Sequence, residues 1–383
     1  MQFLSIPGQA KEKKQLVTQV NQDRIPHAQI LLGRPGSPKL ALALAYACYI
    51  LCQDRKDGDA CGVCKSCLKS MQYKHPDLHF AFPVISKEGK KREDTTSQDF
   101  LDQWRPAVSE NPYLDIQAWS QYIGAEKTQP NINTRECNEM IKQLGMRSFE
   151  SPYKLLLIWL PEYLGKEGNR LLKMIEEPTD NTFIILIAEN QERILNTIIS
   201  RCQITKVSPV SDIQATEYIK ARHPNIDSEI LAQAVQMSDG DLNKALNIAL
   251  GSSIDYSDLL LSWMRLSYKR DFSELNDWIT MLNTKGREDI KHFMEYAMSF
   301  MREYAFYLQT EDVSRLSDSQ QLIAKNMTKI MDMIKVESVA KLLQECLSEI
   351  MRNVNPRICL MAKSIELGDI LRSKDQVKSL YDM

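Results

Sequence analysis

Apolar and polar positions alternate in blocks along the first half of the chain, as strands and helices do in turn. Three short apolar runs have the length of buried strands, namely residues 29–33 (QILLG), 155–159 (LLLIW) and 183–188 (FIILIA). Residues 39–51 are rich in Ala and Leu and predict a helix. Residues 165–177 have helical spacing that stops at Pro178. Continuous apolar strands suit a parallel sheet covered on both faces, so the pattern predicts an α/β layer fold.

The pattern changes after Pro209 and becomes helical. Residues 211–251 have amphipathic spacing with a break at Gly240, and residues 287–367 contain no glycine. We therefore expect an α/β domain over residues 1–208, a small helical domain over 209–252 and an all-α domain over 253–383. Within the first domain, the charged residues 86–97 (SKEGKKREDTTS) predict an exposed loop. That loop belongs to an expected insertion over about 82–125, with some helix around residues 100–104.

The composition is that of a soluble globular protein and excludes few functions. The 383 residues are 43% hydrophobic and 26% charged, with a net charge of −2, so no strong overall field draws the chain to DNA or anionic membranes. No apolar run approaches the ~18 residues of a membrane span, and the first residues have no signal-peptide core. The cytosol is the expected compartment. There, nine cysteines are expected to be thiols or metal ligands rather than disulfides.

The segment GRPGSPKL, which begins at Gly33, has the frame of a phosphate-binding loop. The pattern that cradles nucleotide phosphates is G-x-x-x-x-G-K-[ST], and Gly33 and Lys39 occupy their places in it. Pro38 replaces the second glycine and removes a backbone N–H donor. Leu40 replaces the hydroxyl residue that would bind Mg²⁺. Gly33, Gly36 and Lys39 are therefore candidate nucleotide-binding residues of a degenerate loop that we expect not to function.

Four cysteines with the spacing C-x8-C-x2-C-x2-C are candidate metal ligands: Cys52, Cys61, Cys64 and Cys67. Overlapping C-x-x-C steps let thiolates converge on one ion, and four thiolates suit a closed, structural Zn²⁺ site. Gly62 can supply the tight turn between ligands. His75 and His79 are nearby in sequence, but we expect both to be solvated or core histidines.

The ends of the predicted strands lack acidic residues that an ATPase needs for catalysis. A working site would place Asp-Glu after the run LLLIW, to hold Mg²⁺ and to polarise water. Here Glu162 follows only after Pro161, and it would have to be repositioned to serve. Arg201 lies in the string ISRC after the third strand run. Arginine can stabilise the charge on a transferring phosphoryl group, in cis or from a neighbouring subunit. Taken alone, however, the pattern favours an ordinary surface charge.

Several strings taken together resemble one protein family. In chain order they are RIPHA (24–28), GRPGSPKL, the four cysteines, HPD (75–77), NRLLKMIEEP (169–178) and SRCQ (200–203). The set resembles the bacterial DNA polymerase III clamp-loader subunits, delta-prime and gamma/tau, over roughly residues 1–250. The resemblance implies an AAA+ α/β domain with a zinc module at about 52–67, a helical lid domain and a collar of C-terminal helices. It also implies that Arg201 is an arginine finger, acting in trans on ATP bound to the adjacent subunit.

Departures from the family pattern favour the delta-prime type. The lid string is GDLNKAL (240–246), and Asn243 stands where an ATPase of the family has a second sensor arginine. The loop, the strand-end acids and the lid arginine are all altered while the finger is kept. The chain also ends at residue 383 without a basic or proline-rich extension, which is expected to tell against a tau-like form.

The resemblance therefore implies a stator without ATPase activity of its own, inside a DNA polymerase holoenzyme. Its implied partners are gamma/tau and delta subunits in a hetero-pentamer, which loads the sliding clamp on primed DNA at the bacterial replication fork. ATP would be bound on the neighbour, and Zn²⁺ on this chain. Two alternatives remain open. One is an active gamma/tau-type ATPase with divergent motifs. The other is a zinc-containing nucleic-acid-binding protein without a motor role, for which a modest cluster near the cysteines is the evidence: Lys65, Lys69, Lys74 and Tyr73.

Overall fold

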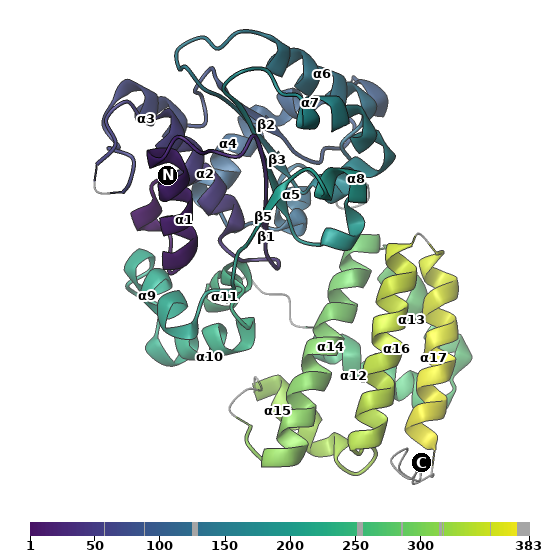
Figure 1. Cartoon of the computed structure of the whole chain (residues 1–383). Helices are drawn as coiled ribbons and strands as arrows, with labels where there is room; N and C mark the ends of the chain where they lie inside the picture. The colour runs from purple at the N-terminus through teal and green to yellow at the C-terminus, as the bar shows by residue number, and fades with distance from the viewer. Residues whose placement is uncertain are drawn as a thin grey trace, which may run out of the picture. The chain divides into compact units, whose positions relative to one another are not determined.

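The computed structural model describes residues 1–56, 58–87, 89–124, 129–250, 256–284, 286–313, 316, 318–352 and 354–373. The chain divides into two compact units, Met1–Gly251 and Ser252–Met383 (Figure 1). The domain boundary expected at residues 252–253 lies outside the described residues, as does the end of the expected insertion at residue 125.

The first unit is built on a five-stranded parallel sheet with the order β2-β3-β4-β1-β5. Its strands are β1 (Ala28–Leu32), β2 (Leu78–Ala81), β3 (Lys154–Trp159), β4 (Thr182–Ala188) and β5 (Gln203–Lys206). This confirms the predicted parallel sheet and the three apolar strands. The strands β2 and β5 were not predicted, because each has only four residues and β5 is largely polar. Register places Leu32 opposite both Ala188 and Lys206, so the carboxyl ends of β1, β4 and β5 meet.

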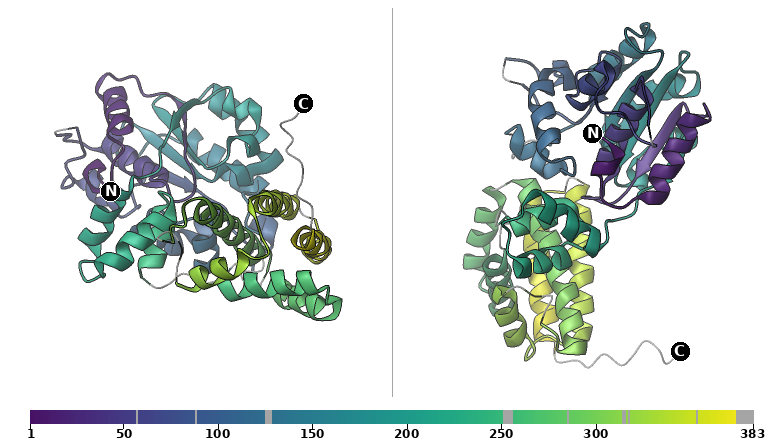
Figure 2. Two further views of the ribbon diagram at one scale, coloured as in Figure 1. Left: turned by 90° about the horizontal axis from the view of Figure 1, so that it is seen from below. Right: turned by 90° about the vertical axis from the view of Figure 1, so that its left-hand side faces the viewer.

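Helices cover both faces of the sheet (Figures 1 and 2). One face packs against α1 (Ala10–Asn21), α2 (Lys39–Leu51), α4 (Leu101–Glu110) and α5 (Ile116–Tyr122). The other packs against α6 (Thr134–Gly145), η4 (Pro161–Leu171), α7 (Leu172–Glu176) and α8 (Asn196–Ile199). Successive residues of a strand point to opposite faces. Leu155 and Leu157 accordingly belong to the first cluster, and Leu156 and Ile158 to the second.

Two expectations about local structure are wrong in part. The segment predicted as one helix over 165–177 is a 3-10 helix, η4, followed by the short α7. Gly165 has φ 51° and ψ −134°, which interrupts the helical backbone. The predicted exposed loop over 86–97 is exposed only in its charged first part. Thr95 and Ser97 at its end are fully buried. Ser97 Oγ bonds the backbone of Phe82, and the Thr95 carbonyl accepts a hydrogen bond from the Asn133 side chain.

Three further helices complete the first unit, and the regular elements in the described part of the second unit are all helices. The three helices of the first unit are α9 (Asp212–Arg222), α10 (Ser228–Ser238) and α11 (Leu242–Ala249). Their buried apolar residues belong to the same hydrophobic cluster as the first face of the sheet. The helices of the second unit are α12 (Ser257–Lys269), α13 (Phe272–Thr284), α14 (Arg287–Thr310), α15 (Asp318–Met327), α16 (Met333–Met351) and α17 (Pro356–Arg372). The second unit has its own core, in which Trp263 stacks on Trp278. The predicted helical C-terminal region is thus confirmed.

Short elements connect this framework. They are η1 (Phe3–Ser5), α3 (Lys65–Met71), η2 (Arg92–Asp94), η3 (Ser97–Phe100) and η5 (Gln191–Arg193). Among the described residues, no helix has both the length and the apolar character needed to cross a membrane.

Candidate functional site

The degenerate loop joins β1 to α2, where a phosphate-binding loop would lie. Gly33 begins it and donates its N–H to the Ala188 carbonyl on β4 at 3.0 Å. Gly36 has φ +68°, a conformation that favours glycine. Pro38 is the N-cap residue of α2 and supplies no side-chain cap. Backbone contacts therefore keep the conformation of the loop. Pro38 gives it one backbone N–H group fewer than the phosphate-binding pattern has.

Lys39 is held by protein groups at the carboxyl edge of the sheet. Its side chain is 4% exposed, and its Nζ lies 2.9 Å from Oε1 of Glu189 at the end of β4. The same Nζ donates a hydrogen bond of 2.9 Å to the Arg34 carbonyl. The Lys39 ammonium group is thus paired with a carboxylate and a backbone carbonyl of the chain itself.

A second carboxylate closes the loop from the side of α11. Asp241 packs on Gly36 so tightly that a Cβ added to Gly36 would lie 1.7 Å from its Oδ1. The Asp241 carboxylate caps α11 by accepting the Lys244 N–H at 2.9 Å, and the Leu242 N–H reaches the Gly36 carbonyl at 3.2 Å. Burial raises the pKa of Asp241 to about 6. Asp241 is thus a half-buried carboxyl group packed directly on the loop.

Glu162 supports backbone groups at the end of β4. Its Oε1 accepts the N–H of Glu189 at 2.5 Å and that of Asn190 at 2.7 Å. Burial raises the pKa of this carboxyl group, and the N–H bonds act in the opposite direction. Leu160 before it has a left-handed backbone, with φ 55°, which turns the chain out of β3. Glu162 is thus an acceptor for the strand end through Oε1, while its Oε2 is buried without a hydrogen-bond partner among the described residues.

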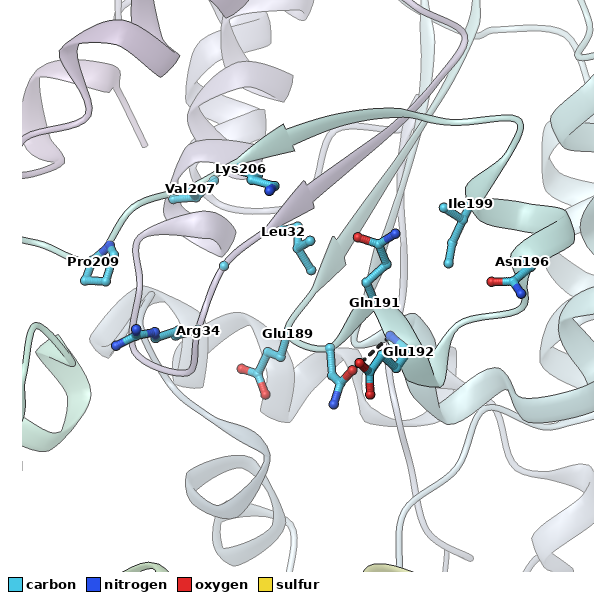
Figure 3. Close-up of a pocket in the computed structure, with 12 residues that line it drawn as sticks. Leu32, Arg34, Glu189, Gln191, Glu192, Asn196, Ile199, Lys206, Val207 and Pro209 are labelled. Atoms are coloured by element: carbon cyan, nitrogen blue, oxygen red, sulfur yellow. Dashed lines mark hydrogen bonds between the residues drawn. The ribbon is translucent and has the colours of Figure 1, made fainter. Parts of the chain in front are cut away.

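A cavity of about 740 Å³ opens beside the loop (Figure 3). Its lining comes from the ends of β1, β4 and β5, from η5 and from α8: Leu32, Gly33, Arg34, Glu189, Asn190, Gln191, Glu192, Asn196, Ile199, Lys206, Val207 and Pro209. Two cations, Arg34 and Lys206, share this lining with two carboxylates, Glu189 and Glu192. The mixed charge offers no concentrated positive site for a polyphosphate.

Asn243 of α11 is 3% exposed, and both its amide oxygen and its amide nitrogen form hydrogen bonds. Its Oδ1 accepts a hydrogen bond of 2.6 Å from the Asn111 side chain, and its Nδ2 donates one of 2.9 Å to Asp115 Oδ2. Both partners lie in the expected insertion. The ring of Tyr113, between them, packs edge-on against Tyr218 of α9 at 5.3 Å. The insertion therefore fastens the helices α9 and α11 to the sheet domain.

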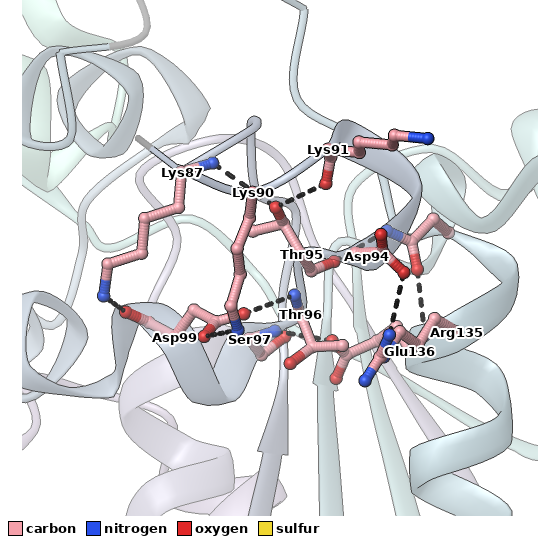
Figure 4. A network of polar contacts seen from close by, with 11 residues as sticks. Lys87, Lys90, Lys91, Asp94, Thr95, Thr96, Ser97, Asp99, Arg135 and Glu136 are labelled. Atoms are coloured by element: carbon pink, nitrogen blue, oxygen red, sulfur yellow. Dashed lines mark hydrogen bonds and ion pairs between the residues drawn. The ribbon is translucent and has the colours of Figure 1, made fainter.

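The insertion is itself fixed by a polar network beside α6 (Figure 4). The buried carboxylate of Glu136 accepts the Ser97 N–H at 2.5 Å. Asp99 accepts the Thr96 N–H at 3.0 Å and pairs with Lys90 at 2.5 Å. Burial raises the pKa of Glu136 to about 7. Many charged side chains of the segment 86–97 thus form contacts within the protein (Figure 4).

Arg201 lies on the surface just after α8, outside the residues that line the cavity. Its side chain is 36% exposed and forms an ion pair with Glu176 of α7. Its Nη1 donates hydrogen bonds to the Thr197 carbonyl at 2.8 Å and to Ser200 Oγ at 3.3 Å. The guanidinium group is thus held at the surface by neighbours on two elements.

The four cysteines converge. The Sγ atoms of Cys52, Cys61, Cys64 and Cys67 all lie within 4.8 Å of one another, which would let them hold one metal ion. Gly62 has φ +75° and forms the turn between ligands. The N–H groups of Val63 and Cys64 point at Cys61 and lower the pKa of its thiol to about 6, whereas burial raises the pKa of Cys52. A thiolate at Cys61 is the form that a metal requires.

The Cys cluster is braced by the first residues of the chain. The N–H groups of Phe3 and Leu4 donate to the Asp59 carboxylate at 3.0 and 2.9 Å, and Gln2 donates to the Ala60 carbonyl at 2.6 Å. His75 is buried and accepts a hydrogen bond from the Asp77 N–H, and it is not one of the converging ligands in this part of the chain.

The family model described as "DNA polymerase III, delta subunit" matches residues 8–211, which is more than half of the chain. The chain belongs to this family. The resemblance drawn from the sequence motifs is thereby confirmed, and several curated relatives are delta-prime subunits.

Identity to individual DNA polymerase III subunits is modest. The delta' subunit of Bacillus subtilis is 26% identical over 203 residues, which are 53% of this chain and 48% of that protein. The delta' subunit of Escherichia coli is 23% identical over 278 residues, 72% of this chain and 68% of that protein. The gamma subunit of Buchnera aphidicola is 24% identical over 255 residues, 64% of this chain and 57% of that protein. The chain thus spans about half to two thirds of the relatives it matches.

The structure of this DNA polymerase III family member adds contacts that its sequence motifs did not predict. Glu189, Asp241 and Glu176 each contact a predicted site residue, and Asp115 contacts Asn243. Asp241 and Glu176 lie within the motifs GDLNKAL and NRLLKMIEEP, but these motifs predict a role for neither residue. A weak signal existed for Glu189, because it directly follows the third predicted strand. Two residues of the cluster considered for nucleic-acid binding are not free to contact a ligand in this structure. Tyr73 is buried, and Lys69 is paired with Glu150.

Proposed function

We propose that this chain is a delta-prime-type clamp-loader subunit of DNA polymerase III that does not hydrolyse ATP itself. One observation carries the proposal: Lys39 of the degenerate loop is buried and paired with Glu189 at 2.9 Å. A phosphate could reach this lysine only by displacing a carboxylate in a partly dry site, where an unpaired charge is costly. Asp241 on Gly36 adds a second barrier.

The fold supports an AAA+ assignment for the first unit. The loop follows the inner strand β1 and opens α2 at the carboxyl edge of a parallel sheet, which is where open α/β sheets bind ligands. We retain the three-domain division into an AAA+ domain over 1–208, a lid over 209–252 and a collar over 253–383. In this arrangement the lid is held by the insertion instead of by a nucleotide.

The chemical contribution of the chain would be Arg201, acting in trans. An arginine supplied to a neighbour's ATP stabilises the charge that develops during phosphoryl transfer and can accelerate hydrolysis by ~10³–10⁵. Such a residue must be exposed and oriented, and Arg201 is both. The γ-phosphate it would serve belongs to ATP on an adjacent gamma/tau subunit.

The remaining parts of the proposal concern assembly. The four thiolates would bind one structural Zn²⁺, because a Cys₄ set leaves no open coordination position for catalysis. The helices of the second unit would form the collar of a hetero-pentamer with gamma/tau and delta subunits. The assembled complex would place the sliding clamp on primed DNA in the bacterial cytoplasm.

The test is reconstitution of the clamp loader with Arg201→Ala. We expect ATPase stimulated by clamp and DNA to fall by at least tenfold and clamp loading to fall with it. Arg170→Ala is the matched control, because Arg170 is also exposed and paired with a nearby glutamate, Glu167. Unchanged ATPase with Arg201→Ala would reject the finger. Tight ATP binding by the isolated wild-type chain would reject the stator role.

The second candidate is an active gamma/tau-type ATPase, favoured by the similarity to a gamma subunit. It requires Lys39 to exchange Glu189 for a phosphate and requires another residue to replace the missing Mg²⁺ ligand at Leu40. ATP turnover by the isolated chain that depends on Mg²⁺ and is lost in Lys39→Ala would establish it.

A further inference from the structure

The guanidinium group of Arg201 is hydrogen-bonded on two sides by residues of its own chain. Glu176 Oε1 contacts both Nε and Nη2 of Arg201, and the Thr197 carbonyl and Ser200 Oγ accept from Nη1. These contacts engage all three guanidinium nitrogens. Nη2 carries two hydrogens and shares one acceptor with Nε, so a donor remains for an oxygen outside the chain.

The two elements that hold this group are fixed by the core. Glu176 is the last residue of α7, directly after Ile175, which is 0% exposed. Thr197 lies on α8, directly before Ile198, which is 1% exposed. Both isoleucines belong to the apolar cluster on the second face of the sheet. The acceptors around Arg201 are therefore mounted on packed elements rather than on free loops, and their spacing is set by the fold.

Orientation matters for an arginine that acts on a phosphate. A long exposed side chain loses rotamer freedom when it is fixed on a ligand, and a planar fork that is already oriented loses less. Without Glu176, the Thr197 carbonyl and Ser200 Oγ would restrain only the Nη1 side of the group. The carboxylate supplies the second point that defines the plane of the guanidinium.

We propose that Glu176 is a positioning residue, which holds the Arg201 guanidinium in the plane from which it reaches a neighbour's γ-phosphate. This inference rests on the proposed finger role of Arg201 and extends it to a second residue. Glu176 would not touch the phosphate. An exposed ion pair contributes little to stability, so its value here would lie in orientation.

The experiment compares Glu176→Gln with Glu177→Gln in the reconstituted clamp loader. Glu177 is the exposed neighbour of Glu176, so Glu177→Gln removes the same charge from the same region. We expect Glu176→Gln to lower the kcat of stimulated ATP hydrolysis roughly two- to fivefold, the range of an exposed ion pair. The KM for ATP should hardly change, because the finger acts in the transition state. Glu177→Gln should behave as wild type.

A double mutant separates positioning from a general structural effect. Glu176→Gln added to Arg201→Ala should cause no further loss, because there is no longer a finger to orient. Equal losses in both backgrounds, a higher rate with Glu176→Gln, or equal behaviour of the Glu176 and Glu177 variants would each overturn the positioning role. If Arg201→Ala alone leaves the rate unchanged, the finger fails and this inference fails with it. If only Arg201→Ala lowers the rate, the finger stands and Glu176 does not position it.

Discussion

Asn243 of α11 donates a hydrogen bond of 2.9 Å to Asp115, which is the N-cap residue of α5 and lies 128 positions earlier in the chain. The contact joins the expected insertion to the helices of the expected lid. A backbone bond also joins the lid to the sheet domain, because the Leu242 N–H donates to the Gly36 carbonyl at 3.2 Å. In a stator this coupling would make the position of the lid independent of nucleotide.

The first prediction concerns this link. Asn243→Ala leaves Asn111 and Asp115 without their buried partner, so it should reduce the free energy of unfolding by about 1–3 kcal/mol. Hydrogen exchange should rise in α9 to α11 while β1 to β4 remain protected. Asn247→Ala is the control, because Asn247 lies on the same helix and is exposed. Equal exchange in the two variants would show that the bond does not hold the lid.

The pair between Lys39 and Glu189 makes a second prediction. Glu189→Gln leaves a buried ammonium group without its carboxylate, which should cost roughly 3 kcal/mol of stability in denaturant unfolding. ATP binding should not appear, because Asp241 still covers Gly36. Glu192→Gln changes an exposed glutamate of the same cavity and should have little effect. Micromolar ATP binding by the Glu189 variant would mean that the pair alone keeps nucleotide out.

Glu136 should make stability depend on pH. Its folded pKa of about 7 lies above the ordinary value of 4.5, so the folded state holds its proton more tightly than the unfolded state. This contribution to stability is complete below pH 4.5 and is lost as the pH rises to 7, amounting to about 2–3 kcal/mol. Glu136→Gln should flatten the stability profile over that window. Glu139→Gln, on the same helix, should reduce the slope only slightly, because the Glu139 charge is a minor cause of the raised pKa of Glu136 beside burial.

Metal content provides a fourth prediction. Purified protein should contain about one equivalent of zinc, and chelation should lower the melting temperature, because the metal fixes residues 52–67. Cys64→Ser should lose the metal, whereas Cys202→Ser should keep it. Zinc should also be released on acidification, since protons compete for the thiolates. A fully folded, metal-free wild-type protein would contradict the assignment.

Local patterns in the sequence predicted most of the framework. Apolar runs identified β1, β3 and β4, and the Ala- and Leu-rich stretch identified α2 with the observed bounds of Lys39–Leu51. These signals are strong because burial on both faces requires continuous apolar residues. The strand β5 and the break at Gly165 were missed, since a short polar strand and a single backbone torsion leave little trace in periodicity.

The sequence by itself determined which chemistry is absent or present: a loop without its second glycine and hydroxyl, four cysteines at ligand spacing, and an arginine after a strand. These are matters of residue type and short spacing. Only the tertiary structure decided what occupies each place, because the partners come from distant segments. Glu189 pairs with Lys39 across the parallel register of β1 and β4, Asp115 reaches Asn243 through the insertion, and Glu176 meets Arg201 where α7 and α8 pack on one face of the sheet.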